Sequence, residues 1–245
     1  MKCVILAAGY ATRLYPLTEN FPKPLLEVQN KPILRWLLED LDTTGSIEEY
    51  IVISNHKFAH HFESWAAQQP WKITVVDDGT DSNETRLGAV RDLLFAMEKL
   101  DLKDDLLVMA GDNLLDFSLS EFVRYGLEKQ APCTLRYFEP SRQKLLKSGV
   151  VSVDDTDRIT LMTEKSPDPA SSWVSIAFYY YPREAAARVK QALEDGCNAD
   201  APGSLLRWLS GNMTCYAMEM PGKRYDIGDL ASYEQVQQEY RGILR

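Results

Sequence analysis

The residues best placed to bind a charged group lie near the N-terminus, in the segment 6–25. The small residues Ala7–Gly9 end a short apolar run, and they let a phosphate or a flat base approach the backbone closely. Exposed N–H groups in such a turn bind anions. Arg13 and Lys23 add positive charge to the same segment, and such cations pair with phosphate oxygens. The segment predicts a polyphosphate-binding loop, although a surface loop with two solvated cations would have the same composition.

Two common nucleotide-binding patterns are absent from this segment. It has neither the GxGxxG spacing of dinucleotide-binding loops nor the GxxxxGK[ST] spacing of Walker A loops. The missing dinucleotide pattern argues against a nicotinamide-dependent dehydrogenase.

Two aspartates are placed where a carboxylate could meet a ligand. Asp112 directly follows an apolar run at 106–110, and Asp226 precedes an amphipathic pattern at 231–240. Mg²⁺ in proteins usually takes one or two carboxylates and completes its shell with water and substrate phosphate oxygens. Taken alone, Asp112 could equally be a turn residue and Asp226 a residue at a helix cap.

The elements that must position these residues alternate between strand and helix patterns in the first half of the chain. Apolar runs predict strands at 3–8, 50–54, 73–76 and 106–110. Three helices are predicted between them: one with Pro32 in its first turn and an apolar face over 33–41, and two others at 56–67 and 87–100. Asn30 is expected to cap the first of these helices. The second half is mixed, with strands predicted at 133–138, 149–153 and 173–181 and helices at 183–193, 205–209 and 231–240. This rhythm predicts a Rossmann-like three-layer α/β/α fold around a mostly parallel sheet, with ligands at the carboxyl ends of its strands.

The bulk properties exclude several classes of protein. The 245 residues carry a formal net charge of −9, which argues against non-specific binding to nucleic acid or to an anionic membrane. No apolar run approaches the roughly 18 residues that a membrane span requires. No signal-peptide pattern precedes Gly9, and the four cysteines have no zinc-ligand spacing. We therefore expect a cytoplasmic protein. The three histidines (His56, His60 and His61) fall on a predicted surface helix and are expected to be structural.

A family resemblance adds to this interpretation. The run LAAGYATRLYPLTENFPKPLLEVQNKPIL resembles the signature of sugar-phosphate nucleotidyltransferases, most closely that of the glucose-1-phosphate thymidylyltransferase-like branch. Shorter matches follow in the family's order at Gly111–Asn113, Glu164–Lys165 and Tyr225–Gly228. The resemblance covers nearly the whole chain and implies the nucleotide-diphospho-sugar transferase type of fold.

The resemblance also implies roles for particular residues. It makes Asp112 and Asp226 the ligands of a Mg²⁺ cofactor, and Arg13, Lys23 and Asp112 the catalytic residues. The nucleotide-binding residues that the resemblance implies are Leu6, Ala8, Gly9, Asn83 and Gly88. The sugar-phosphate-binding residues that it implies are Gly149, Glu164, Lys165, Val174 and Tyr179.

Three positions depart from the family pattern. Ala11 replaces the second glycine of the loop, and we expect it to keep an ordinary backbone conformation, because a Cβ in a left-handed conformation costs roughly 1 kcal/mol or more. Asn83 replaces the glutamine of a Gln-x4-Gly element that ends at Gly88, and a polar turn at the start of a helix would look the same. Ser148 replaces a tyrosine beside Gly149, which leaves the identity of the sugar open.

The sequence thus predicts one nucleotidyltransferase domain over residues 1–245, with a nucleotide-binding half at about 1–112 and a sugar-phosphate-binding half at about 113–245. The expected partners are a nucleoside triphosphate, with dTTP or UTP favoured, and a sugar-1-phosphate. No nucleic acid or membrane partner is expected, and a homo-oligomer stays open. Two alternatives remain: a cytidylyltransferase acting on phosphocholine or a similar small phosphate, and an inactive protein that senses nucleotide sugars.

Overall fold

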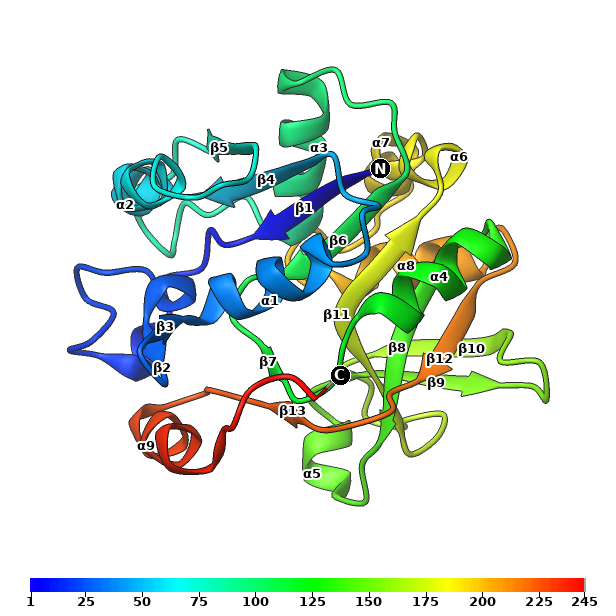
Figure 1. The fold of residues 1–245 in the computed structure, drawn as a ribbon. Helices are drawn as coiled ribbons and strands as arrows, with labels where there is room; N and C mark the ends of the chain where they lie inside the picture. The colour runs from blue at the N-terminus through cyan, green and yellow to red at the C-terminus, as the bar shows by residue number, and fades with distance from the viewer. Residues whose placement is uncertain (245) are drawn as a thin grey trace. The chain divides into compact units, whose positions relative to one another are not determined.

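The computed structural model describes residues 1–244 of the chain. Their contacts divide them into two compact units, both drawn in Figure 1. Unit 1 comprises Met1–Leu87, Met109–Glu121 and the segment from Pro221 onward. Unit 2 comprises Gly88–Val108 and Phe122–Met220. Each unit is therefore assembled from segments that are distant in sequence.

The central sheet of unit 1 contains β1 (Lys2–Leu6), β4 (Glu49–Ser54), β5 (Ile73–Asp77) and the end of β6 (Leu106–Ala110), in the order β6-β1-β4-β5. β4 pairs in parallel with both β1 and β5. The strands read as continuous apolar runs because a parallel sheet is buried on both faces. Cys3, Val4 and Ile5, for example, are all fully buried. α1 (Ile33–Asp42) and α2 (His56–Ala66) supply the helices of this unit's first segment.

The start of α1 differs from the expectation. Pro32, and not Asn30, is the N-cap residue of α1. Gln29 and Asn30 both have left-handed backbone conformations, with φ of 54° and 59°. Two consecutive positive φ values suit the tight turn between antiparallel strands, here β2 (Glu27–Val28) and β3 (Lys31–Pro32). Asn30 thus serves a hairpin that precedes the helix.

The last segment of unit 1 folds back onto the first two. β13 (Arg224–Tyr225) pairs antiparallel with β7 (Leu114–Leu115), and α9 (Leu230–Glu239) follows. The hydroxyl of Tyr233 donates to the carbonyl of Glu27 (2.6 Å), and the amide of Gln29 donates to the carbonyl of Gln237 (2.6 Å). Their apolar counterpart is a buried cluster drawn from all three segments: Leu14, Leu26, Val28, Ile33, Leu114, Ile227, Val236 and Tyr240.

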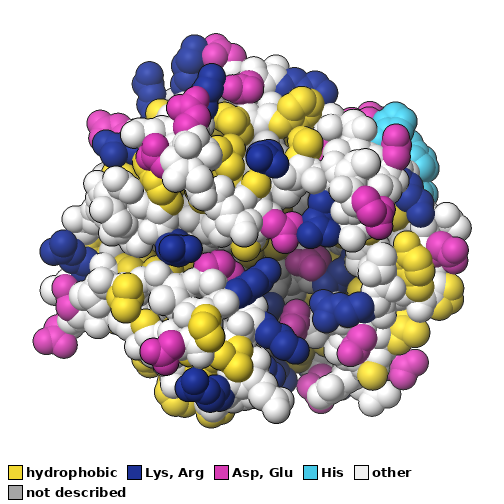
Figure 2. All heavy atoms as spheres, turned by 180° about the vertical axis from the view of Figure 1, so that it is seen from behind, with side chains coloured by type: hydrophobic (Ala, Val, Ile, Leu, Met, Phe, Trp, Pro, Cys, Tyr) yellow, Lys and Arg dark blue, Asp and Glu magenta, His cyan; other side chains and the backbone are white. Residues whose placement is uncertain are grey.

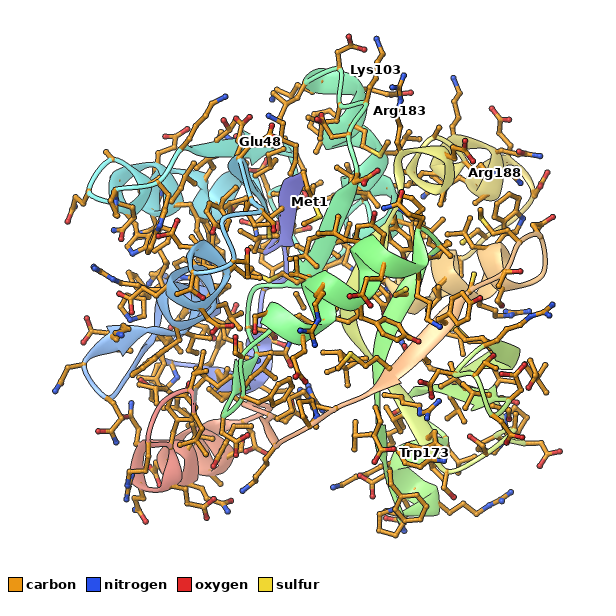
Figure 3. The ribbon with its side chains drawn as sticks, turned by 45° about the vertical axis from the view of Figure 1, so that its right-hand side comes forward. Met1, Glu48, Lys103, Trp173, Arg183 and Arg188 are labelled. Carbon is orange, nitrogen blue, oxygen red and sulfur yellow. The ribbon has the colours of Figure 1, made fainter. Side chains whose placement is uncertain are left out.

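Unit 2 is built on antiparallel pairs. β11 (Trp173–Tyr181) pairs with β8 (Cys133–Phe138) and β9 (Gly149–Val153), and β9 pairs with β10 (Ile159–Glu164). β12 (Tyr216–Glu219) runs parallel to β8. Trp173, labelled in Figure 3, begins β11 and packs edge-on against Phe138, with ring centroids 5.7 Å apart. The helices are α3 (Ala89–Lys99), α4 (Ser120–Lys129, which begins at the end of unit 1), α5 (Arg142–Leu145), α6 (Arg183–Ala186), α7 (Val189–Glu194) and α8 (Gly203–Ser210).

Most predicted elements are present. The strands predicted at 106–110, 133–138, 149–153 and 173–181 match β6, β8, β9 and β11 residue for residue. The helix predicted at 183–193 is two helices, α6 and α7. β10, β12 and α4 were not predicted, and neither were α5 and the two-residue strands β2, β3, β7 and β13. The prediction of one domain with halves meeting near residue 112 stays a prediction.

The surface carries mixed charge. Figure 2 shows acidic and basic side chains interspersed over the visible face, with the histidines gathered at one edge. His60 and His61 are neighbours there, with ring centroids 4.0 Å apart, and His56 and His60 are exposed on α2. Within residues 1–244, none of the helices combines the length and apolarity needed to cross a bilayer.

Candidate active site

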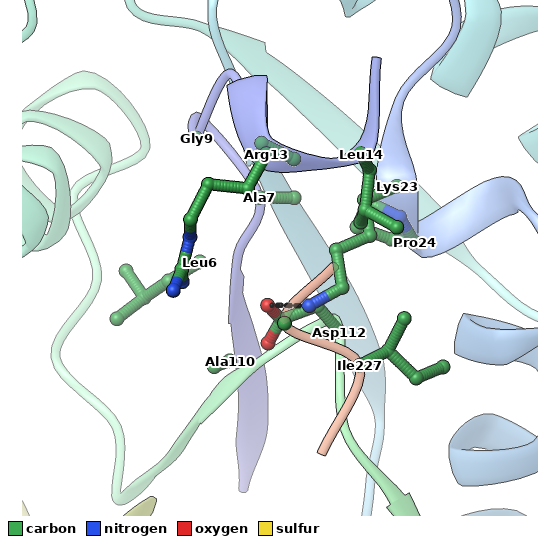
Figure 4. A pocket seen from close by; sticks show the side chains of 12 residues that line it. Leu6, Ala7, Gly9, Arg13, Leu14, Lys23, Pro24, Ala110, Asp112 and Ile227 are labelled. Atoms are coloured by element: carbon green, nitrogen blue, oxygen red, sulfur yellow. Dashed lines mark hydrogen bonds and ion pairs between the residues drawn. The ribbon is translucent and has the colours of Figure 1, made fainter. Parts of the chain in front are cut away.

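A cavity of about 220 Å³ opens in unit 1 (Figure 4). Its lining comes from four segments: 6–14, 23–24, 110–112 and 227–228. The first and third segments follow β1 and β6, so the cavity lies at the carboxyl ends of these strands, where α/β sheets bind ligands. Gly111 lets β6 end close to β1, because a Cβ there would lie 2.8 Å from a methyl group of Ile5. Four sequence-predicted residues line this cavity together with Asp112: Leu6, Gly9, Arg13 and Lys23.

Hydrogen bonds to Ile53 and Asn55 fix the backbone of the first loop. The N–H of Ala7 donates to the carbonyl of Ile53 (2.9 Å), and the side-chain amide of Asn55 donates to the carbonyl of Ala8 (3.0 Å). Ala8 is buried and does not line the cavity, so its predicted contact with a nucleotide stays a prediction. A Cβ on Gly9 would meet nothing within 4 Å, which leaves open space at the turn.

The backbone conformation of Ala11 differs from the expected one. Its backbone is left-handed, with φ 46° and ψ 42°, and not in an ordinary conformation. Surrounding hydrogen bonds impose this geometry. The carbonyl of Ala11 accepts from the N–H of Leu14 (3.0 Å) and from the hydroxyl of Thr18 (2.8 Å). The short 3-10 turn η1 (Thr12–Leu14) begins at this point. The loop therefore keeps the conformation that a glycine would favour and tolerates the cost of a Cβ.

Lys23 and Asp112 form the central charge pair of the cavity. The lysine Nζ lies 2.7 Å from Oδ2 of Asp112, and η2 (Lys23–Leu25) places the lysine there. The Lys23 side chain is only 9% exposed, whereas that of Asp112 is 41% exposed. Burial opposes ionisation of Asp112, but the Lys23 ammonium and, more weakly, Arg224 hold the pKa of this carboxyl below its ordinary value. Asp112 is therefore an anion that faces the cavity at neutral pH.

Arg13 supplies a second cation to the cavity. Its guanidinium lies beside the backbone of Gly228, since a Cβ on Gly228 would be 4.0 Å from Nη1 of Arg13. Figure 4 shows the Arg13 side chain and the Lys23–Asp112 pair around the same space. An anion in this cavity would thus meet cations from two turns of one loop.

Asp226, the second predicted metal ligand, is held by Arg224. Nη1 of Arg224 donates to Oδ1 of Asn113 (2.9 Å) and to Oδ1 of Asp226 (3.3 Å). The Asp226 side chain is 67% exposed. The cavity wall includes its neighbours Ile227 and Gly228 but not Asp226 itself. Among residues 1–244, no group of three or more His, Cys, Asp or Glu side chains could enclose a metal ion.

The two residues of the predicted base-reading element belong to different units. Asn83 is exposed in unit 1, where its Oδ1 accepts from Arg86 (2.8 Å). Gly88 is the N-cap residue of α3 in unit 2, with φ 93°, and a Cβ there would lie 2.7 Å from the carbonyl oxygen of Ala199. The N–H of Val90 donates to that same oxygen (2.9 Å). Gly88 thus serves close backbone packing, and its contact with a base stays a prediction.

Within unit 2, four of the predicted sugar-phosphate residues lie on β9, β10 and β11, and Lys165 directly follows β10. Glu164 lies opposite Gly149, and Val174 lies opposite Val150. The N–H of Lys165 donates to the carbonyl of Ser148 (3.0 Å), while its side chain is exposed. Tyr179 is buried.

Glu164 has an unusual environment for a carboxylate. It is half-buried, and within residues 1–244 it makes neither a hydrogen bond nor an ion pair through its side chain. Burial raises its pKa, with Lys165 and Arg207 opposing the rise. A carboxylate without a protein partner keeps its acceptor positions available to a ligand.

Three contributors were missed from the sequence: Arg224, Asn55 and Gly203. The signal for Arg224 was its place two residues before Asp226. Asn55 follows a predicted strand, and its amide reaches the first loop across the sheet. No sequence pattern marks Gly203, because its contact with Glu164 depends on how a helix covers the sheet.

The site is a small-residue loop with two cations and a facing carboxylate, and it lies at the strand ends of a parallel sheet in an α/β protein. The fold is that of solved nucleotide-sugar enzymes, as predicted. One is a UDP-glucose pyrophosphorylase complexed with UDP-glucose (TM-score 0.80, 20% identity, 97% of each chain covered). Another is a putative glucose-1-phosphate thymidylyltransferase from Bacillus anthracis (TM-score 0.79, 21% identity, 97% of this chain and 94% of that chain covered).

The nucleotidyl transferase family profile matches residues 2–242, and the chain belongs to this family. A UTP–glucose-1-phosphate uridylyltransferase from Synechocystis sp. is 28% identical over 256 residues, covering 100% of this chain but 63% of the relative. A second such uridylyltransferase, from Haloferax volcanii, is 30% identical over 184 residues, covering 74% of this chain and 72% of that relative. The chain thus spans less than two thirds of the length of the Synechocystis relative.

Proposed function

We propose that this protein transfers a nucleoside monophosphate from a nucleoside triphosphate to a sugar-1-phosphate and releases pyrophosphate. The Lys23–Asp112 pair carries the proposal, because it places a buried cation and an exposed carboxylate side by side in the cavity beyond β1 and β6. Membership of the nucleotidyl transferase family supports it, as do relatives named as sugar-1-phosphate uridylyltransferases.

In the proposed reaction, an oxygen of the sugar phosphate attacks the α-phosphorus of the triphosphate in line. The bond between that phosphorus and the oxygen bridging to the β-phosphate breaks, and pyrophosphate leaves with the bonding electrons. Lys23 neutralises charge at the α-phosphate, and Arg13 binds the leaving pyrophosphate. Positioning and charge neutralisation together supply most of the acceleration. No general base is needed, because a phosphate monoester is largely ionised near neutrality.

Mg²⁺ is the proposed cofactor, with Asp112 and Asp226 as the residues that would hold it. Two carboxylates suit this ion, which completes its shell with water and phosphate oxygens and does not need a cage of protein ligands. The exposed carboxylates of Asp112 and Asp226 fit that donor set. When bound, the ion would neutralise and orient the reacting phosphate oxygens.

The sugar phosphate is proposed to bind unit 2. Glu164 accepts hydrogen bonds from sugar hydroxyls, and the exposed Lys165 pairs with the phosphate. Gly149, Val174 and Tyr179 shape the apolar side of this site. The uridylyltransferase relatives favour UTP with glucose-1-phosphate, and dTTP is the second choice. The cytoplasmic location and any homo-oligomer stay predictions.

The test is a pyrophosphate-release assay that crosses UTP, dTTP, CTP, GTP and ATP with glucose-1-phosphate, other sugar phosphates and phosphocholine, with and without Mg²⁺. Metal-dependent release with one nucleotide and one sugar-1-phosphate, absent in Asp112→Asn, is the expected result. Release only with CTP and phosphocholine would replace the proposed substrates. Binding of a nucleotide sugar by folded protein that releases no pyrophosphate with any pair would point to the sensing role.

A further inference from the structure

The carboxylate of Glu164 occupies space that two glycines leave empty. A Cβ built on Gly149 would lie 2.6 Å from Oε2 of Glu164, and a Cβ built on Gly203 would lie 2.5 Å from the same oxygen. Contacts this short do not occur for real side chains, so an alanine at either position would displace the carboxylate. The carboxylate therefore lies between two backbones, that of β9 and that of the first turn of α8.

The sheet explains the contact with Gly149. Glu164 and Gly149 are directly opposed in the β9–β10 pair, so their side chains would share one face of the sheet. Because Gly149 has no side chain, the Glu164 carboxylate can fold across the neighbouring strand. Met162 lies two residues before Glu164 on that face, with its terminal methyl 3.6 Å from the position of a Gly149 Cβ.

The helix explains the contact with Gly203. α8 packs against β10 and β11 and covers this part of the sheet. Gly203 is buried, and its Cβ position would also lie 3.4 Å from the Met162 methyl and 3.4 Å from the Tyr179 hydroxyl. Any larger residue at 203 would therefore enter the group of side chains around Glu164.

This arrangement is costly as packing alone. Burying a carboxylate that has no hydrogen-bonding partner among residues 1–244 costs free energy, and two glycines and a methionine methyl do not offset that cost. An apolar side chain in place of Glu164 would pack at lower cost. The cost is understandable if the carboxylate is kept there for a ligand.

We propose that Gly203 is a positioning residue for sugar recognition: it leaves the space in which the Glu164 carboxylate is held ready to accept hydrogen bonds from hydroxyls of the sugar phosphate. This inference rests on the proposed function and adds to it a residue outside the family's signature matches. The effect of Gly203 acts through Glu164 and not through the nucleotide.

The experiment compares Gly203→Ala with Gly211→Ala in the full chain. Gly211 lies at the other end of α8, where a Cβ would meet only one carbonyl oxygen, of Trp208, at 3.5 Å. Gly203→Ala should raise KM for the sugar-1-phosphate at least tenfold and leave KM for the nucleoside triphosphate within twofold. Gly211→Ala should leave both constants unchanged. Equal constants in Gly203→Ala and wild type would overturn the inference.

A double-mutant cycle separates positioning from general damage. If Gly203 acts through Glu164, then Glu164→Ala with Gly203→Ala should have the same sugar-phosphate KM as Glu164→Ala alone. If the KM change in the double variant instead equalled the product of the changes in the two single variants, that coupling would be refuted. Should Gly203→Ala alone fail to fold, the double variant should fold, because the clashing carboxylate is gone; an unfolded double variant would contradict the inference. Absence of activity in the wild type would instead count against the proposed function.

Discussion

Nζ of Lys23 lies 2.7 Å from Oδ2 of Asp112, joining residues that are 89 positions apart in the sequence. The lysine is almost completely enclosed, whereas the aspartate faces the cavity. A divalent cation that bound Asp112 would therefore weaken the ion pair between Asp112 and Lys23. The Lys23 ammonium would stay in the cavity, because its side chain is enclosed. The lysine would then pair with the next available anion, which in the proposed reaction is the α-phosphate. Metal binding and phosphate binding are expected to be cooperative for this reason.

Replacing Lys23 tests this pair. Lys23→Gln should lower kcat/KM roughly 100-fold or more, because it removes a fixed cation from the reacting phosphate. The pKa of Asp112 should rise, since its main stabilising charge is gone. Steady-state kinetics measures the first effect, and NMR titration of the labelled carboxyl measures the second. Lys31→Gln is the control, because Lys31 pairs with Glu39 and does not line the cavity. Unchanged kinetics in Lys23→Gln would remove the lysine from the mechanism.

Asp226→Asn tests the proposed metal site. The variant should need at least tenfold more Mg²⁺ for half-maximal activity and should bind Mn²⁺ correspondingly more weakly, as followed by electron paramagnetic resonance. The fold should be kept, because the Asp226 side chain is exposed and its ion pair with Arg224 is worth little. Asp101→Asn is a suitable control, because Asp101 is an exposed carboxylate that does not line the cavity. Wild-type metal dependence in Asp226→Asn would leave Asp112 as the remaining candidate ligand.

Glu164→Gln should separate stability from activity. The folded-state pKa of Glu164 lies above its ordinary value of 4.5, so the folded protein binds this proton more tightly than the unfolded chain does. The resulting penalty is absent below pH 4.5, grows as the pH rises toward the folded-state pKa, and is complete above it. At pH 7 the variant should be more stable by on the order of 1 kcal/mol, while its KM for the sugar phosphate rises.

Denaturant unfolding at several pH values measures that difference in stability. The wild-type and Glu164→Gln curves should converge near pH 4.5 and separate at higher pH. A gap that does not vary with pH would mean that the ionisation of Glu164 is not its source.

Ala11→Gly should be tolerated and should not lower the stability of the first loop. The left-handed backbone costs alanine roughly 1 kcal/mol, which glycine avoids, although glycine gives back part of the gain through the entropy of the unfolded chain. The net change in the free energy of unfolding should lie between zero and about 1 kcal/mol of stabilisation. Ala11→Val should destabilise, because a β-branched residue tolerates positive φ poorly. Thermal unfolding of the three proteins ranks them, and Ala11→Val as the most stable would contradict the assigned conformation.

The sequence was informative where a local pattern determines local structure. A continuous apolar run located β6, because a strand buried on both faces needs one. β8, β9 and β11 were recognisable as short segments rich in apolar and aromatic residues. β10 was missed because Thr160 and Leu161 are exposed and polar residues interrupt its apolar ones, so the strand contains no apolar run. The break between α6 and α7 carries no glycine or proline that would mark it.

In the candidate site, too, the residues of a local motif were predictable, and those that depend on tertiary contacts were not. The loop residues Arg13 and Lys23 were recognisable because a motif places them within one segment. The conformation of Ala11 was predicted wrongly, because intrinsic preference was weighed without the hydrogen bond from Thr18. Gly203 could not be found, since only packing of α8 brings it to Glu164.

The attachment of α9 to the β2–β3 hairpin affects how the chain can be made. The bonds from Tyr233 to Glu27 and from Gln29 to Gln237 join residues 206 and 208 positions apart. At a synthesis rate of 5–20 residues per second, the hairpin waits roughly 10–40 s for its partner to leave the ribosome. Throughout that time Leu26 and Val28 lack Val236 and Tyr240 to cover them, and the cavity lacks the wall formed by Ile227 and Gly228. A nascent chain therefore exposes these apolar residues to aggregation until residues 227–240 have left the ribosome, and the wall of the cavity is incomplete until then.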